Sequence, residues 1–180
     1  MIRQKWIFNY AILLLGIVFL SLTACHREPA YVSNPTYKNL PAYQRQLLVD
    51  LEKSGMQVIK QGMQFTFVIP ADCFFVKSTR ELKSHRGKDL DRLAQFINGY
   101  SRYFARPRVT VTGYTDKVWL SPARDLLSMH YAETIAAFLR EDAVPSDMIT
   151  VRGMGAKHPI ASNHYPMGTS FNRRVEIVVR

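Results

Sequence analysis

The sequence has few residues of the kinds that build covalent or metal-based sites. It contains two cysteines in 180 residues, Cys25 and Cys73, which excludes a disulfide framework and a cysteine metal site. Its five histidines lack metal-ligand spacing, and neither G-x-S-x-G nor H-E-x-x-H occurs. Ser121, before a helical pattern, is better explained as an N-cap than as a nucleophile. The sequence therefore predicts no enzyme, no metal and no cofactor.

Acidic residues are also scarce, and the first 24 residues have none. This segment has Arg3 and Lys5, then an apolar run over residues 11–20, then small residues before Cys25. The order is that of a secretory signal. Leu22-Thr23-Ala24-Cys25 resembles the lipobox of bacterial lipoproteins, which implies cleavage before Cys25 and acylation of that cysteine. The alternative is an uncleaved membrane anchor, for which the run is short.

Charge gives a second constraint on the environment of the mature chain. The full chain has 24 basic and 14 acidic residues. Removal of residues 1–24 would leave 22 basic and 14 acidic residues, a net charge of +8. This balance indicates anionic surroundings, but it does not require nucleic acid, and we expect none as a partner. By resemblance to enterobacterial sorting, His26 after the lipidated cysteine favours the outer membrane.

Residues 25–41 are predicted to be the lipidated cysteine and a tether, followed by a domain at 42–180. Three prolines and the lack of apolar periodicity indicate disorder over residues 26–41. The alternative is that Tyr31 and Tyr37 dock on a partner. Cys73 lies in the apolar stretch 69–76, so burial is favoured over pairing with another chain.

Within the domain, hydrophobic spacing predicts strands alternating with helices. Helices are predicted at 43–53, ending near Gly55, at 88–101 and at 121–141, the last with Pro122 at its first position. Its expected buried stripe consists of Leu127, Tyr131, Ile135 and Phe138 or Leu139. Strands are predicted as a hairpin around Gln61-Gly62, with Met63, Phe65, Phe67 and Ile69 on one face, and near 108–114, 148–155 and 173–180. This order predicts an α+β fold with one sheet covered by helices.

One acid–base pair stands where a strand leads into a helix. Asp116 follows the strand, and Arg124 falls in the first turn of the helix, where the partial positive charge of the N-terminus disfavours a cation. A carboxylate and a guanidinium held close together bind a zwitterion, because one takes an ammonium and the other a carboxylate. Taken singly, Asp116 is more often a turn cap and Arg124 a solvated residue.

Four motifs around this pair resemble the OmpA-like peptidoglycan-binding domain. They are Thr112-Gly113-Tyr114-Thr115-Asp116, Leu120-Ser121-Pro122-Ala123-Arg124, residues 151–160 and residues 172–177. The resemblance implies a two-layer α/β sandwich with one mixed sheet. It also implies that Asp116 and Arg124 bind the diaminopimelate of a peptidoglycan stem peptide, supported by Thr115, Asn172 and Arg174.

Two departures from the family pattern set this chain apart. Asp116 and Leu120 are separated by three residues, fewer than in the family, and Phe74-Phe75 is followed by Val76 rather than an acid, with Asp72 as a displaced substitute. A small lipoprotein with this shortened loop resembles the OmpA-like lipoproteins of the Dot/Icm type IVB secretion system. This implies other outer-membrane core subunits as partners. The alternative is an assembly subunit whose wall-binding site is an empty remnant.

Overall fold

The computed structural model describes residues 37–118 and 122–180, in which helices and strands alternate along the chain. The elements are α2 (Ala42–Lys53), β1 (Gln57–Gln61), β2 (Gln64–Pro70), α3 (Ala71–Phe74), α4 (Gly87–Ser101), β3 (Val109–Tyr114), α5 (Pro122–Glu141), the 3-10 helix η2 (Ser146–Met148), β4 (Ile149–Gly153), α6 (Pro166–Asn172) and β5 (Arg174–Val179). The predicted α+β class is confirmed. The signal segment 1–24, Cys25 and Ser121 lie outside the described residues.

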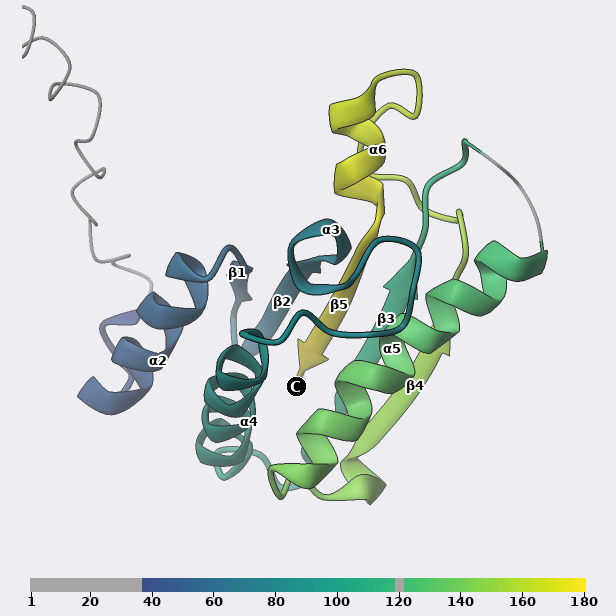
Figure 1. Ribbon diagram of the computed structural model, residues 1–180. Coiled ribbons are helices and arrows are strands. Elements are labelled where there is room, and N and C mark those ends of the chain that lie inside the picture. Colours follow the sequence, from purple (N-terminus) through teal and green to yellow (C-terminus); the bar gives the residue numbers. More distant parts are fainter. Residues whose placement is uncertain (1–36, 119–121) are drawn as a thin grey trace, which may run out of the picture. The chain divides into compact units, whose positions relative to one another are not determined.

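The strands form one mixed sheet in the order β1-β2-β5-β3-β4. β5 pairs antiparallel with both β2 and β3, and β3 pairs parallel with β4. The last strand of the chain therefore occupies the middle of the sheet (Figure 1). In this register Pro70, Arg174 and Tyr114 lie side by side where β2 ends, β5 begins and β3 ends.

Alternation along the strands separates a buried face from an open one. Phe65, Phe67 and Ile69 of β2 are fully buried, as are Val175, Ile177 and Val179 of β5. Helices α4 and α5 cover this face, and α2 packs beside α4 (Figure 1). The predicted face of β2 is thus confirmed except at Met63, which is exposed because it belongs to the two-residue turn. Gly62, at φ +60°, supplies the backbone conformation for that turn.

Two predicted helices form largely as the sequence indicates. Helix α2 ends in a Schellman motif, in which the Gly55 N–H donates to the Glu52 carbonyl and the Met56 N–H to the Leu51 carbonyl. Gly55 takes φ +94°, the left-handed conformation that this motif requires. Helix α5 begins at Pro122, as predicted. Its buried residues are Ser128, Tyr131, Ala132, Ile135, Ala136 and Leu139.

The stripe predicted for α5 needs one correction. Leu139, not Phe138, is the fully buried member, and Leu127 is only partly buried. Leu127 lies near the start of the helix, where its side chain lines a pocket. Leu127 therefore packs against the core with only part of its side chain, and the rest forms part of the pocket wall.

The predicted domain boundary was too late in the chain. Tyr37 and Leu40, assigned to the tether, are both buried in the hydrophobic core. The Tyr37 ring packs against Phe65, with centroids 6.2 Å apart, and its hydroxyl donates to a Glu52 carboxylate oxygen at 3.0 Å. Residues 37–41 thus belong to the same compact unit as the sheet. Apolar periodicity missed them because two isolated side chains form no repeating pattern.

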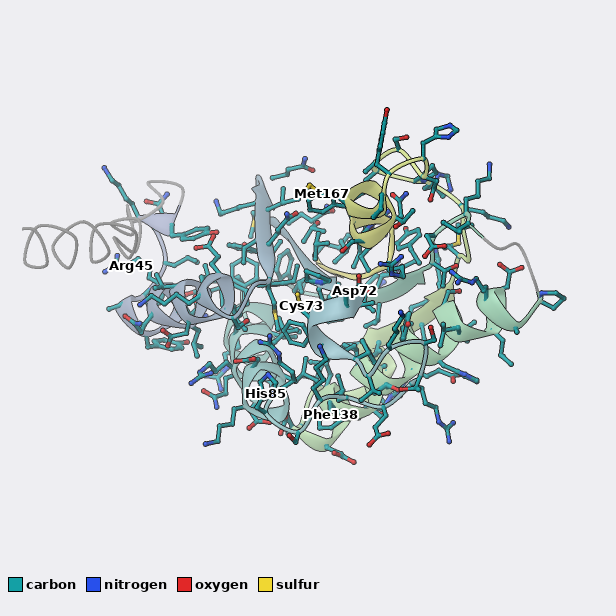
Figure 2. The ribbon with its side chains drawn as sticks, turned by 45° about the horizontal axis from the view of Figure 1, so that its top comes forward. Arg45, Asp72, Cys73, His85, Phe138 and Met167 are labelled. Carbon is teal, nitrogen blue, oxygen red and sulfur yellow. The ribbon has the colours of Figure 1, made fainter. Side chains whose placement is uncertain are left out.

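The burial predicted for Cys73 from the apolar stretch 69–76 is wrong, because the segment after β2 forms the short helix α3. The helical turn buries Ala71 and Phe74 and leaves Cys73 exposed. Asp72 and Cys73 leave α3 in different directions (Figure 2).

The part of the chain that the structure describes contains no helix long and apolar enough to cross a membrane.

Candidate functional site

A pocket lies at the edge of the sheet where β2 and β3 end and β5 begins. It has a volume of about 580 Å³, within the usual range for small-ligand sites. The residues that line it come from α3, the segment between α3 and α4, the segment after β3, α5 and the residue before β5. They are Ala71, Asp72, Phe75, Val76, Lys77, Ser78, Lys83, Thr115, Asp116, Arg124, Leu127, Tyr131 and Arg173.

Four charged side chains alternate in sign along the pocket. Asp116 Oδ1 accepts a hydrogen bond from Arg124 at 2.7 Å, and its Oδ2 accepts one from Arg173 at 2.6 Å. Arg173 also donates through Nε and a terminal nitrogen to the two carboxylate oxygens of Asp72, at 2.8 and 2.5 Å. The order is therefore Arg124, Asp116, Arg173, Asp72. Asp116 is 2% exposed, whereas Arg124 and Arg173 are 27% and 26% exposed and can still meet a ligand.

These contacts keep both carboxylates ionised. Burial would raise the pKa of Asp116, but hydrogen bonds from Arg173, the Val118 N–H and Arg124 outweigh it and hold that pKa below its usual range. The hydrogen bond from Arg173 likewise lowers the pKa of Asp72. In return, hydrogen bonds to Asp72 and Asp116 raise the pKa of Arg173. The cluster therefore presents two anions and two cations at neutral pH.

The local fold explains how Arg124 reaches Asp116. A Cβ placed on Gly113 would lie 1.9 Å from the Ser128 carbonyl oxygen, so only glycine allows α5 to pack this closely on β3. The Ser128 hydroxyl also accepts a hydrogen bond from the Gly155 N–H at 2.9 Å, which ties α5 to the segment after β4. The pairing with buried Asp116 offsets the unfavourable position of Arg124 in the first turn of α5.

Two of the predicted supporting residues lie at the site in different roles. Thr115 lines the pocket and is 3% exposed, and within the described residues its hydroxyl has no hydrogen-bond partner. Asn172 does not line the pocket. Its amide binds the backbone of Ile160 and Ala161 and the side chain of Asn163, which in turn accepts from the Lys117 N–H. Asn172 thus holds the chain beside Asp116 in place.

The structure does not bring Arg174 to the pocket. Its guanidinium lies 4.0 Å from the Tyr114 ring centroid and donates to Glu176 at 2.7 Å. It also donates to the backbone carbonyls of Asn172 and His158. Arg174 shares strand parity with Glu176, opposite to the buried Val175, so it points to the face of the sheet that the helices leave open.

Two residues of the cluster, Arg173 and Asp72, were missed as site residues by sequence reasoning. The sequence did contain an indication for Arg173. It lies an even number of positions from Val175, Ile177 and Val179, so its side chain is expected on the same covered face of the sheet. The sequence offered Asp72 only as a displaced substitute for the missing acid, and in the structure its carboxylate pairs with Arg173. The position of Asp72 depends on the short helix α3, which the hydrophobic periodicity of the sequence does not predict.

The other wall of the pocket is apolar. Phe75 and Tyr131 pack with ring centroids 4.5 Å apart, and Val76 and Leu127 complete this side. Burial raises the pKa of Tyr131, so its phenol is protonated at neutral pH. The pocket thus combines an apolar wall with a charged cluster, a combination typical of small-ligand sites. In the ranges 37–118 and 122–180, no group of histidine, cysteine and acidic residues is arranged to hold a metal ion.

The fold is an α/β sandwich with a charged pocket at one edge of its sheet, and comparison with known proteins gives its family. Residues 74–173 match the OmpA family, and the chain belongs to that family. The chain is 30% identical over 126 residues to the probable lipoprotein YiaD of Escherichia coli, covering 70% of this chain and 56% of that protein. It is 44% identical over 72 residues to the peptidoglycan-binding protein ArfA of Mycobacterium tuberculosis, covering 40% of this chain and 22% of ArfA. The chain thus spans about half of YiaD and less of ArfA.

A solved structure supports the fold assignment. The cell wall anchor of the T6SS from Pseudomonas aeruginosa superposes with a TM-score of 0.66 at 24% identity, covering 74% of this chain and 94% of that one. This similarity confirms the two-layer sandwich with its mixed sheet.

Proposed function

We propose that this chain binds peptidoglycan non-covalently, through the free end of diaminopimelate in a stem peptide. The observation that carries the proposal is buried Asp116, held between the partly exposed guanidiniums of Arg124 and Arg173 in a pocket of about 580 Å³. Membership of the OmpA family and the similarity to a protein named for peptidoglycan binding support it.

The chemistry of the pocket assigns each part of the ligand a place. The carboxylate of the diaminopimelate end group would accept hydrogen bonds from the exposed edges of Arg124 and Arg173. Its ammonium would donate to Asp72, which is 43% exposed, and to Asp116. The methylene chain would lie against Phe75, Leu127 and Tyr131, which form the apolar wall. Thr115, with its unpartnered hydroxyl, would supply a further hydrogen bond.

We further propose that the chain is a lipoprotein acylated at Cys25 and held at the periplasmic face of the outer membrane. The lipobox-like sequence before Cys25 supports this, as does the similarity to a probable lipoprotein. The shortened segment after Asp116 resembles DotK, also called IcmN, of the Dot/Icm type IVB secretion system. On this proposal the domain links the outer-membrane core subunits of that machine to the cell wall.

Co-sedimentation with purified sacculi tests wall binding. The full-length chain in detergent should sediment with sacculi, and free stem peptide containing diaminopimelate should release it. Asp116→Asn and Arg124→Gln should each lose roughly 10- to 150-fold in affinity, because each removes a hydrogen bond between charged groups. Equal sedimentation of the wild type and both variants, with all three folded, would contradict the proposal.

A second function is favoured by one specific observation. All four carboxylate oxygens of Asp116 and Asp72 already accept hydrogen bonds from arginines of the same chain. An internally satisfied cluster is what an assembly subunit with a degenerate site would retain. In that case the wild type would not sediment with sacculi, yet would still co-purify with the outer-membrane core subunits.

A further inference from the structure

The pocket carries more positive charge than a single zwitterion needs. Its lining includes two carboxylates and four cations, and the two carboxylates are matched by Arg124 and Arg173. The excess comes from Lys77 and Lys83. In the described ranges, neither lysine has a carboxylate within 4.0 Å of its ammonium.

Both lysines lie on a loop whose conformation is fixed by its own hydrogen bonds, here called the lysine lip (residues 76–83). The Val76 N–H donates to the Glu81 carbonyl at 2.8 Å, and the Lys83 N–H to the Phe74 carbonyl at 2.9 Å. The Thr134 hydroxyl of α5 donates to the Arg80 carbonyl at 3.0 Å. Because the lip is anchored at both ends and to α5, its ammonium groups are presented at a defined edge of the pocket.

Both ammonium groups keep donors for a ligand. Lys83 donates one hydrogen bond, to the Asp72 carbonyl oxygen at 2.8 Å, which holds its ammonium beside the charged cluster and leaves two N–H groups. Lys77 is exposed and lines the pocket. Thr115 also lines the pocket, and its buried hydroxyl has no partner within the described residues. Unpaired cations beside a cavity favour a second anionic group on whatever binds there.

We propose that the lysine lip is a second subsite, which binds a further free carboxylate of the same stem peptide. This rests on the proposed function, because the first subsite must hold the diaminopimelate end group. The pocket would then prefer stem peptides whose other carboxyls are free and reject those in which they are amidated. Lys77 and Lys83 would set this specificity without contacting the end group itself.

The test combines a change in the ligand with a change in the lip. Two forms of the tripeptide L-alanyl-D-glutamyl-diaminopimelate are titrated calorimetrically into the full-length chain in detergent at low ionic strength. Both keep the diaminopimelate end group, and one has its remaining carboxyls amidated. The proteins are the wild type, Lys77→Gln, Lys77→Gln/Lys83→Gln and Arg80→Gln. Arg80 is the matched control, because it is on the lip but does not line the pocket.

We expect the preference for the free form of the peptide to depend on the lysines of the lip. The wild type should bind the free form about 2- to 25-fold more tightly than the amidated form, because each of two partly exposed ion pairs contributes roughly 1.5- to 5-fold. The double variant should bind both forms equally, Lys77→Gln should be intermediate, and Arg80→Gln should keep the wild-type preference. If the wild type binds both forms equally, the lip is not a subsite, although the proposed function stands. If it binds neither, both proposals are wrong.

Discussion

Arg173 and Arg174 are neighbours in sequence but lie on opposite faces of the sheet. Arg173 points to the covered side, bridges Asp116 and Asp72, and stays 26% exposed at the pocket. Arg174 points to the open side, lies over Tyr114 beside Glu176, and is 2% exposed. The same residue type thus serves two purposes, because Arg173 is the extended residue just before β5 and successive side chains of extended backbone point to opposite faces. A partly exposed guanidinium such as that of Arg173 can meet a ligand, whereas the enclosed guanidinium of Arg174 holds the fold together.

Of the changes at the two arginines, the larger effect is expected on stability, at Arg174. Replacing it in Arg174→Met should lower the free energy of unfolding by about 2 to 4 kcal/mol. This is less than the loss for a fully buried pair, because Glu176 is 24% exposed. Urea denaturation measures the change. Stem-peptide affinity of the folded variant should match the wild type, and a large loss of affinity would place Arg174 in the site after all.

Arg173→Met is the matched change on the other face. It should reduce stem-peptide affinity roughly 10- to 150-fold, because a charged hydrogen-bonding partner of the ligand is lost. Calorimetric titration at a temperature where the variant is folded measures this. If Arg173→Met kept full affinity, Arg173 would not contribute to stem-peptide binding. The two arginines would then differ only in their structural positions.

The pH dependence of stability sharpens the contrast further. The pKa values of Asp72 and Asp116 are lowered in the folded chain, so the unfolded chain takes up protons first as pH falls. The stabilisation is complete above the unfolded-state pKa of about 3.9 and is lost as pH falls through the lower folded-state values. Urea unfolding between pH 6 and pH 3 should show this decline. Asp116→Asn should show a shallower decline, and an unchanged slope would contradict the assignment.

The smallest effect is expected at Leu127, on the pocket wall. Leu127→Ala should cost about 1 kcal/mol of stability, because this side chain is only partly buried. Leu139→Ala on the same helix is the control, and it should cost about 2 to 5 kcal/mol because Leu139 is fully buried. Equal melting temperatures for the two variants would show that Leu127 belongs to the core, as its spacing first predicted.

Periodicity predicted most of the fold. The strands and long helices follow from alternation and helical spacing, and Pro122 and Gly55 correctly marked two helix ends. Helices α3 and α6 were not predicted, since segments of four and seven residues are too short to show a period. Tyr37 was missed for a related reason, because it reaches the core from an irregular segment and not from a repeating element.

The part of the site that could be predicted is the part formed by residues close together in the sequence. Asp116 and Arg124 were expected to meet across one turn, and they do, at 2.7 Å. Arg173 and Asp72 are 101 positions apart, and their pairing depends on β5 entering the sheet between β2 and β3. No local pattern carries that information. Strand parity alone would have chosen Arg173 over Arg174, because Val175, Ile177 and Val179 mark the covered face.

The central claim is that the cluster around Asp116 holds the diaminopimelate end group. The most direct measurement is calorimetric titration of a diaminopimelate-containing stem peptide into the full-length chain and its Arg124→Gln variant. The account predicts saturable binding by the wild type and a roughly 10- to 150-fold weaker affinity for the variant, whose fold remains intact. Equal affinities, or no binding by the wild type at millimolar peptide, would contradict it.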